Sequence, residues 1–329
     1  MENYDCNQSA ERVLMDASRK KNQNRNRLLF IVITITVGVI FSVFSLIYGK
    51  MEIDIQKNMK ADGMAVSTYI ENGTADMTQQ LTQLPCIESI GKEKFAGKLL
   101  DDSIKYCDCV ITDVTGFEKM IRPAFTNVVG TYPEKENEIM LSTKTLQYLG
   151  IKNPEVGMEI ELDFYWNDIF NTSGTGMQNF LLSGYFTEYQ NQTSGASVAF
   201  LSEKSMEKNG LQGEPCRILI DHTKKYSSGS QIEHMLTNNI KLNEGQRIVS
   251  MNPAEYRAIS EMMGSYGFAV FFLVMVLLSM FLFIYNILNI SLEKDLQRYG
   301  LLQVIGVEQK QNIKVMNREM LKIGLTGSI

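Results

Sequence analysis

Two long stretches of the chain carry no charged side chain. Residues 28–48 and residues 267–290 contain no Asp, Glu, Lys or Arg, and apolar side chains dominate both. A helix of about 20 apolar residues spans the hydrocarbon core of a bilayer. The pattern therefore predicts two transmembrane helices, with the polar segment of residues 49–266 between them.

A cleaved secretory signal or the buried helix of a soluble core can also contain a long apolar stretch. The first stretch is longer than the roughly 7–15 apolar residues of a signal core, and it continues into Tyr48 and Gly49 without an Ala-x-Ala cleavage site. The second stretch places large apolar side chains on every helical face, whereas a soluble helix keeps a polar stripe. Both alternatives are therefore disfavoured.

Basic residues lie before the first predicted span and after the second. Residues 19–27 carry five Lys and Arg and no acid, and Lys and Arg outnumber Asp and Glu after residue 290. Because short basic flanks stay in the cytosol, both chain ends are expected inside and residues 49–266 outside the cell membrane. Residues 51–266 hold 29 Asp and Glu against 19 Lys and Arg, so their net charge is −10. Such acidity argues against nucleic acid as a partner.

Cysteines are the chemically reactive residues of the outer segment. Four of the five lie there: Cys86, Cys107, Cys109 and Cys216. An even count permits two disulfides in an oxidising compartment, although the sequence does not give their pairing. A thiol reagent added from outside is expected to reach Cys109 or Cys216 but not Cys6.

No catalytic or metal-binding pattern stands out. Cys107 and Cys109 are spaced more closely than usual zinc ligands and have no neighbouring His. His222 and His234 belong to no nucleophile motif, and the chain lacks a G-x-x-x-x-G-K-[ST] phosphate loop. We therefore expect no metal, no cofactor and no nucleotide hydrolysis by this chain itself.

The outer segment mixes helix and strand patterns. Runs rich in β-branched side chains predict strands at residues 65–70, 109–114, 216–221 and 247–251, and helical spacing predicts helices at residues 78–84 and 230–236. Short strands are expected in the middle, at residues 138–141, 157–162 and 180–186. The expected fold is an α+β lobe built from both ends of the segment, with a β-rich lobe of about residues 123–186 inserted.

Helical stalks are expected where the outer segment meets the membrane. Residues 51–60 alternate charges with Ile53 and Ile55. Before the second span, Asn252 at the cap, Pro253 at the first helical position and Glu255 at the third predict a helix start. This second helix is predicted to continue without interruption into the membrane. Stalks of this kind would tie movement of the outer domain to movement within the bilayer.

The segments at the two chain ends are expected in the cytosol. Residues 1–27 form a polar N-terminal segment, and residues 291–322 have the pattern of an amphipathic helical segment. Residues 323–329 turn apolar and small, which predicts the start of a third transmembrane helix in a truncated chain. For residues 291–322 taken alone, a helix lying on the membrane surface is the simpler interpretation.

The segment after the second span resembles the signature of FtsX-like permeases, the MacB-type membrane subunits of ABC transporters. That signature is charged-x-x-Gly-x-Leu-x-x-x-Gly, followed by an acid before the third span. The matching positions here are Gly300, Leu301, Leu302, Ile305, Gly306 and Glu319. Arg298 and Tyr299 stand where many members have Glu followed by Ile or Leu. Five outer segments are also similar to the family pattern: residues 129–133, 138–142, 149–150, 156–160 and 182–186.

The resemblance implies a permease subunit that lacks a motor and docks on a separate ABC-type ATPase. It implies a second permease half, from another chain or from the rest of a longer one. The residues implied in ATPase coupling are Asp295, Arg298, Gly300, Leu301, Leu302, Ile305, Gly306 and Glu319. The outer domain would export or do mechanical work on an envelope substrate such as a peptide, a lipoprotein or a drug.

A two-span sensory receptor, of the chemoreceptor or histidine kinase type, shares this layout. Such receptors continue from the second span into a long heptad-patterned helix, whereas Gly300 and Gly306 interrupt any repeat here. An adhesion or structural anchor without a motor is a third hypothesis. It predicts that no ATPase copurifies.

Overall fold

The computed structural model describes residues 23–99, 106–166, 175–189, 196–208, 216–265, 267–304, 321 and 325. The chain divides into two compact units. One contains residues 1–50 and 263–329, and the other contains residues 51–262. Each unit is described by itself below.

Two long apolar helices form the first unit. Helix α2 runs over Gln23–Asp62 and continues into the second unit, and helix α8 runs over Gly267–Val304. Their most apolar 18-residue windows have mean hydropathies of 2.7 and 2.6, and 6% and 0% of these windows are buried. A core helix of a soluble protein would be mostly buried, so both helices have the length, composition and exposure of membrane spans.

Two hydroxyl groups within the first apolar stretch are satisfied by the helix itself. The Thr36 hydroxyl donates to the Val32 carbonyl at 2.7 Å, and the Ser42 hydroxyl donates to the Gly38 carbonyl at 2.7 Å. Large side chains such as Phe41 are exposed on the same helix. This is the arrangement expected in lipid, where polar groups without internal partners are costly.

The second unit is a mixed α/β domain. Its strands are β1 (Thr68–Gly73), β2 (Ile87–Leu99), β3 (Tyr106–Thr112), β4 (Thr126–Gly130), β5 (Glu138–Ser142), β6 (Glu159–Trp166), β7 (Thr175–Thr187), β8 (Ala196–Leu201), β9 (Cys216–His222) and β10 (Arg247–Ser250). Its helices are α3 (Ala75–Thr82), the π-helix η1 (Gly116–Ile121), the 3-10 turn η2 (Arg122–Ala124), α4 (Thr143–Tyr148), α5 (Glu203–Lys208), α6 (Gly229–Asn239) and α7 (Ala254–Ser265).

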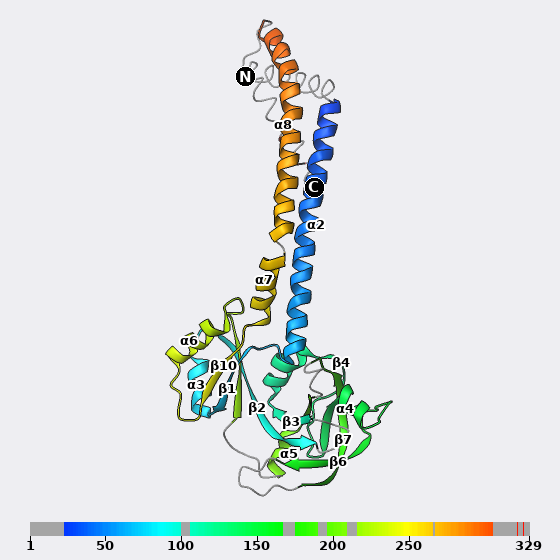
Figure 1. The fold of residues 1–329 in the computed structure, drawn as a ribbon, viewed down its shortest axis with the longest axis vertical. Helices are drawn as coiled ribbons and strands as arrows, with labels where there is room; N and C mark the ends of the chain where they lie inside the picture. The colour runs from blue at the N-terminus through cyan, green and yellow to red at the C-terminus, as the bar shows by residue number, and fades with distance from the viewer. Residues whose placement is uncertain are drawn as a thin grey trace, which may run out of the picture. The chain divides into compact units, whose positions relative to one another are not determined.

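One ten-stranded sheet, counted over the described residues, runs through this domain. The order along it is β10-β1-β9-β2-β3-β8-β5-β7-β4, and β6 pairs with β2 and β7 (Figure 1). Most pairs are antiparallel, while β3–β8 and β5–β7 are parallel. Strands from the two ends of the domain sequence, such as β1 and β9, therefore lie side by side.

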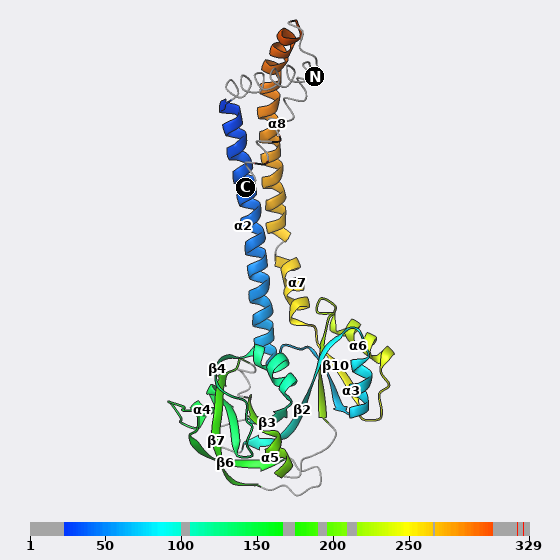
Figure 2. The ribbon, with the colours of Figure 1, turned by 180° about the vertical axis from the view of Figure 1, so that it is seen from behind.

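The first lobe consists of β10, β1 and β9 with two covering helices. Figures 1 and 2 both show α3 and α6 together beside β1 and β10. Met77 and Leu81 of α3 and Ile232 and Leu236 of α6 share one core cluster with buried isoleucines of the three strands. The helices bury these side chains because their apolar positions recur at intervals of four residues.

The second lobe is built around β3, β8, β5 and β7. One core cluster joins these strands to β6 and to Leu146 of α4. Another joins them to η1 and η2, and it contains the rings of Phe117, Phe125, Phe186 and Phe200 in stacked, tilted and T-shaped contacts. The predicted fold class is confirmed: a mixed α/β domain with a β-rich lobe is joined to apolar helices.

The sequence predicted nine elements of this domain, and each has a counterpart. The bounds of the predicted strands at residues 65–70, 109–114 and 157–162 differ by two to four residues from those of β1, β3 and β6. The strands β2, β4 and β8 and the helices η1, η2, α4 and α5 were not predicted. Strand β2 was not recognised in the sequence because its charged residues interrupt the apolar pattern. Glu93 is one of these residues, although its side chain is buried in the structure.

The expected accessibility of Cys109 is wrong. Its side chain is 0% exposed and lies with Cys107 in the core of the second lobe. Burial raises the pKa of the Cys109 thiol well above its ordinary value, so the reactive thiolate is scarce. Cys86 and Cys216 are partly exposed, and all four cysteines of the outer segment are free thiols. Cys6 lies outside the described residues.

Candidate coupling site at the stalk base

Two helices pack against each other at the edge of the domain unit. After the uncharged residues 28–48, the end of α2 carries Asp54, Lys57 and Asp62 and belongs to the domain unit. Ile55 of this part forms a core cluster with Ala254 and Ala258 of α7. We call the contact made by residues 51–62 and 254–262 the stalk base.

Small side chains allow this close packing. Ala258 is 0% exposed, and Ala254 is also buried. Met51 and Met59 cover the flanks of the Ile55 contact. Because interiors are densely packed, a larger side chain at position 258 has no free volume to enter.

Polar bonds reinforce the apolar contact. The Asn58 amide donates to the Ala254 carbonyl at 3.4 Å, and the Arg257 guanidinium reaches the Asn58 carbonyl at 3.5 Å. The same guanidinium makes a short hydrogen-bonded ion pair with Asp62. Both charged side chains are more than half buried, so solvent screens this pair less than a surface pair. The bonds fix the two helices in one register.

The end of α2 is tied directly to the domain. Gly63 has φ +75° and its N–H donates to the Met59 carbonyl at 2.9 Å, which ends the helix in a left-handed glycine cap. Two residues later, the Ala65 N–H donates to the Met120 carbonyl at 2.6 Å. Helix α2 is therefore fixed to the π-helix η1 within three residues of its end.

The start of α7 is tied to the first lobe. The Met251 N–H donates to the Ser67 carbonyl at 2.8 Å, and the Gly229 N–H donates to Asn252 Oδ1 at 2.8 Å. The sequence predicted Asn252 as the cap of its own helix. That prediction is wrong for the side-chain oxygen, because it accepts from the first residue of α6 while α7 begins at Ala254.

The predicted continuous helix from the stalk into the apolar stretch stays a prediction at residue 266, and the structure describes helix on both sides of it. Helix α7 ends at Ser265 and α8 begins at Gly267, while Tyr266 lies outside the described residues. Five of the eight predicted ATPase-coupling residues lie in α8: Asp295, Arg298, Gly300, Leu301 and Leu302. The other three lie outside the described residues: Ile305, Gly306 and Glu319.

Comparison with protein families assigns the C-terminal part of the chain. Residues 270–329 match the family described as FtsX-like permease C-terminal. The chain carries an FtsX-like permease region. This match covers most of α8 and the segment that follows it, and it confirms the family resemblance inferred from Gly300 to Gly306.

Two solved structures are similar to the domain that precedes the permease region. The periplasmic region of MacB from Actinobacillus actinomycetemcomitans is 12% identical, with a TM-score of 0.36, over 64% of this chain and 98% of that one. The extracellular domain of the noncanonic ABC-type transporter YknZ from Gram-positive bacteria is 11% identical, with a TM-score of 0.30, over 54% and 89%. No curated protein sequence matches the chain significantly.

The stalk base yields a prediction about packing. Substituting Ala258→Leu should destabilise the α2–α7 contact by roughly 1–3 kcal/mol, because the added carbon atoms meet Ile55 at a filled site. Amide hydrogen exchange of residues 254–262 measures this opening. Ala61→Leu, at an exposed position of α2, is the matched control and should change protection by less than about 0.5 kcal/mol. Equal protection in both variants would contradict the packing described here.

Proposed function

We propose that this chain is the membrane permease subunit of a MacB-type ABC transporter and passes motion from a separate ATPase to its extracytoplasmic domain. The observation that carries the proposal is the match of residues 270–329 to the FtsX-like permease C-terminal family. The stalk base supports the mechanical part, because the end of the long apolar helix α2 lies in the domain unit in direct contact with α7.

Helix α2 is suited to transmitting a displacement. Its 40 residues correspond to about 60 Å at 1.5 Å per residue. A continuous hydrogen-bonded helix resists compression, so displacement at one end reaches the other. At the domain end, the Ala65–Met120 hydrogen bond and the Arg257–Asp62 ion pair would pass it to η1 and α7.

The proposed ATPase contact lies after the second span. Residues 291–322 form the proposed coupling segment, with Asp295, Arg298, Leu301 and Leu302 in α8. Leu301 and Ile305 are four positions apart and would share one helical face. Gly300 and Gly306 would allow close approach of a partner. Energy would come from the partner, since the sequence has no phosphate-binding loop of its own.

The proposed orientation places residues 1–27 and 291–322 in the cytosol and residues 49–266 outside. The charge distribution supports it, because the basic flanks surround the apolar stretches and the outer segment is acidic. A second permease half would complete the transporter. The proposed work is export of, or force on, an envelope substrate such as a peptide, a lipoprotein or a drug.

Disruption of the coupling segment should separate the permease from its ATPase. Leu301→Asp combined with Ile305→Asp is expected to abolish copurification of an ABC-type ATPase from native membranes, because two charges replace the apolar contact face. Gln303→Asp, which adds a charge on the same helix, is the control and should retain the ATPase. Mass spectrometry of affinity-purified chain measures this. Undiminished ATPase with the double variant would refute the coupling role.

Interrupting the stalk should uncouple the domain from ATP turnover. Inserting Gly-Gly after Glu261 breaks the helical continuity of α7 beyond its contact with α2. We expect the complex to keep its ATP turnover while ATP-dependent changes in hydrogen exchange of residues 216–250 become smaller, because after the insertion only the path through α2 reaches these residues. The same insertion after Asn153, in an exposed turn, should preserve both. Unaltered exchange changes after the Glu261 insertion would exclude transmission through α7.

The orientation is testable with a single accessible cysteine. Val114 is 77% exposed on the domain, so Val114→Cys in a background without other cysteines should react with an impermeant maleimide in intact cells. A cysteine retained only at position 6 should react only after the membrane is opened. The reverse pattern would place the domain in the cytosol.

A further inference from the structure

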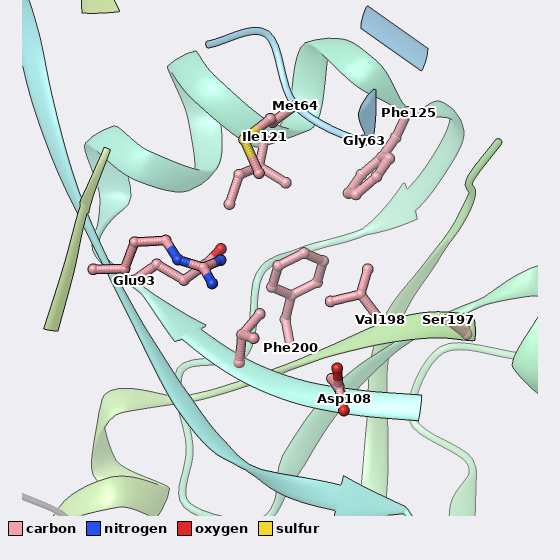
Figure 3. A pocket seen from close by; sticks show the side chains of 11 residues that line it. Gly63, Met64, Glu93, Asp108, Ile121, Phe125, Ser197, Val198 and Phe200 are labelled. Atoms are coloured by element: carbon pink, nitrogen blue, oxygen red, sulfur yellow. The ribbon is translucent and has the colours of Figure 1, made fainter. Parts of the chain in front are cut away.

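A cavity of about 190 Å³ lies in the domain between the sheet and the end of α2. Its floor is formed by neighbouring strands β9, β2, β3 and β8, and its roof by η1, η2 and the connection that follows α2. Figure 3 shows Met64 and Ile121 on one side, with Phe200, Val198 and Asp108 across from them. The cavity belongs neither to the stalk base nor to the permease region.

An ion pair between the buried Glu93 and the partly exposed Arg217 forms one end of the cavity. Glu93 and Arg217 are direct partners in the β2–β9 register, and Arg217 Nη1 donates to Glu93 Oε1 at 2.7 Å. The guanidinium also lies 4.7 Å from the centre of the Tyr69 ring. Burial raises the pKa of Glu93, and Arg217 opposes that rise. The positive charge of Arg217 is therefore committed to Glu93.

Asp108 supplies a further negative charge. It lines the cavity from β3, and its side chain is 53% exposed. Its ion-pair partner is Lys98, at 3.8 Å and 47% exposed, and such a long exposed pair contributes little. Ser197 shares hydrogen bonds with Ser142, Thr145 and Glu188, so its hydroxyl is already engaged. Glu93, Asp108 and Arg217 of the lining sum to −1, and Lys98, outside the lining, is the only cation paired with Asp108 among the described residues.

The remaining lining is apolar and matches the size of one ring. It consists of Met64, Val110, Ile121, Phe125, Val198 and Phe200. Benzene binds in an apolar cavity of about 150 Å³, whereas drug-sized ligands need about 300–1,000 Å³. The volume of about 190 Å³ therefore fits one aromatic ring with a short substituent.

We propose that this cavity binds an organic ammonium group carried on a small aromatic or branched apolar body. The apolar body lies among Phe125, Phe200 and Ile121, and the ammonium donates to Asp108. A carboxylate is disfavoured because it would add a second negative charge beside Glu93, which Arg217 already neutralises. The acidity of residues 51–266 favours approach of the same class of ligand.

The cavity is built close to the end of α2. Gly63 and Met64, which follow that helix, contribute to the cavity, and Ala65 is hydrogen-bonded to η1 in its roof. Close packing holds η1 on the sheet, since a Cβ at Gly91 would lie 2.5 Å from Gly116 Cα. η1 is a π-helix, a conformation frequent at functional sites. The proposed binding needs neither the ATPase nor the proposed transmission.

Calorimetric titration of the full chain in lipid nanodiscs with 2-phenylethylamine tests the proposal. We expect saturable binding at least about tenfold tighter than binding of 2-phenylethanol or 3-phenylpropanoate, which share the ring but lack the ammonium charge. Asp108→Asn should weaken amine binding by about tenfold, as expected for losing a charge-assisted hydrogen bond. It should leave the weak binding of the alcohol unchanged.

Two further variants keep the test decisive. Glu161→Gln removes the same charge from an exposed position on β6 and should change amine affinity by less than about twofold, since screening weakens distant charges. Val198→Phe should remove binding of the amine and the alcohol alike by filling the cavity. Circular dichroism confirms folding of each variant. Absent amine binding, tighter binding of 3-phenylpropanoate, or unchanged affinity in Asp108→Asn would each overturn the proposal.

The ammonium could belong to a free amine or to the amino end of a peptide. Titration with the peptide amide Phe-Gly-Gly-Gly distinguishes these sources. Tighter binding of the peptide assigns a peptide amino terminus, and tighter binding of 2-phenylethylamine assigns a small amine; both support the proposed chemistry. An N-acetylated form of the peptide should not bind, and binding of that form would contradict it.

Discussion

The bilayer core offers no water to backbone amides, and this constraint determines how the two units of the chain can communicate. Only segments that satisfy their own N–H and C=O groups can cross it, so a mechanical signal from one side of the bilayer to the other must travel along the spanning helices. Helix α2 meets the requirement over its apolar stretch, where even Thr36 and Ser42 bond to their own helix. In the proposed mechanism, movement of α2 is passed to the domain at its contact with α7. The small, buried Ala258 matters because it allows the two helices to pack closely there.

The stalk base combines two kinds of contact with different roles. The apolar contact of Ile55 with Ala254 and Ala258 provides adhesion that is nearly independent of direction. The bonds of Arg257 to Asp62 and to the Asn58 carbonyl have directional requirements, so they fix the register of one helix against the other. A partly buried ion pair adds little net stability compared with an apolar pair, but it penalises sliding because a displaced charge loses its partner.

Much of the fold was readable from sequence, because apolar periodicity is local. The uncharged stretches, the α3 and α6 helices and the strands β9 and β10 follow from residues within a few positions of one another. The cavity and the stalk base were not predictable in this way. Glu93 and Arg217 are 124 positions apart, and Asp62 and Arg257 are 195 apart. In the sequence, none of these four residues differs in pattern from the other charged residues. Only the β2–β9 register and the helix packing bring them together, and paired substitution among homologues would be the signal that finds them.

Residues 63–65 connect the stalk base to the cavity. Gly63 ends α2, Met64 lines the cavity, and Ala65 bonds to η1. A ligand that separates the roof from the floor would therefore act on the same residues that carry displacement from α2. By reciprocity, any movement of α2 that alters the roof must change ligand affinity by the same free energy that the ligand contributes to the movement. If movement of α2 alters the roof, ligand binding in the cavity and the position of α2 are thermodynamically coupled. This coupling does not need a conformational pathway through the rest of the sheet.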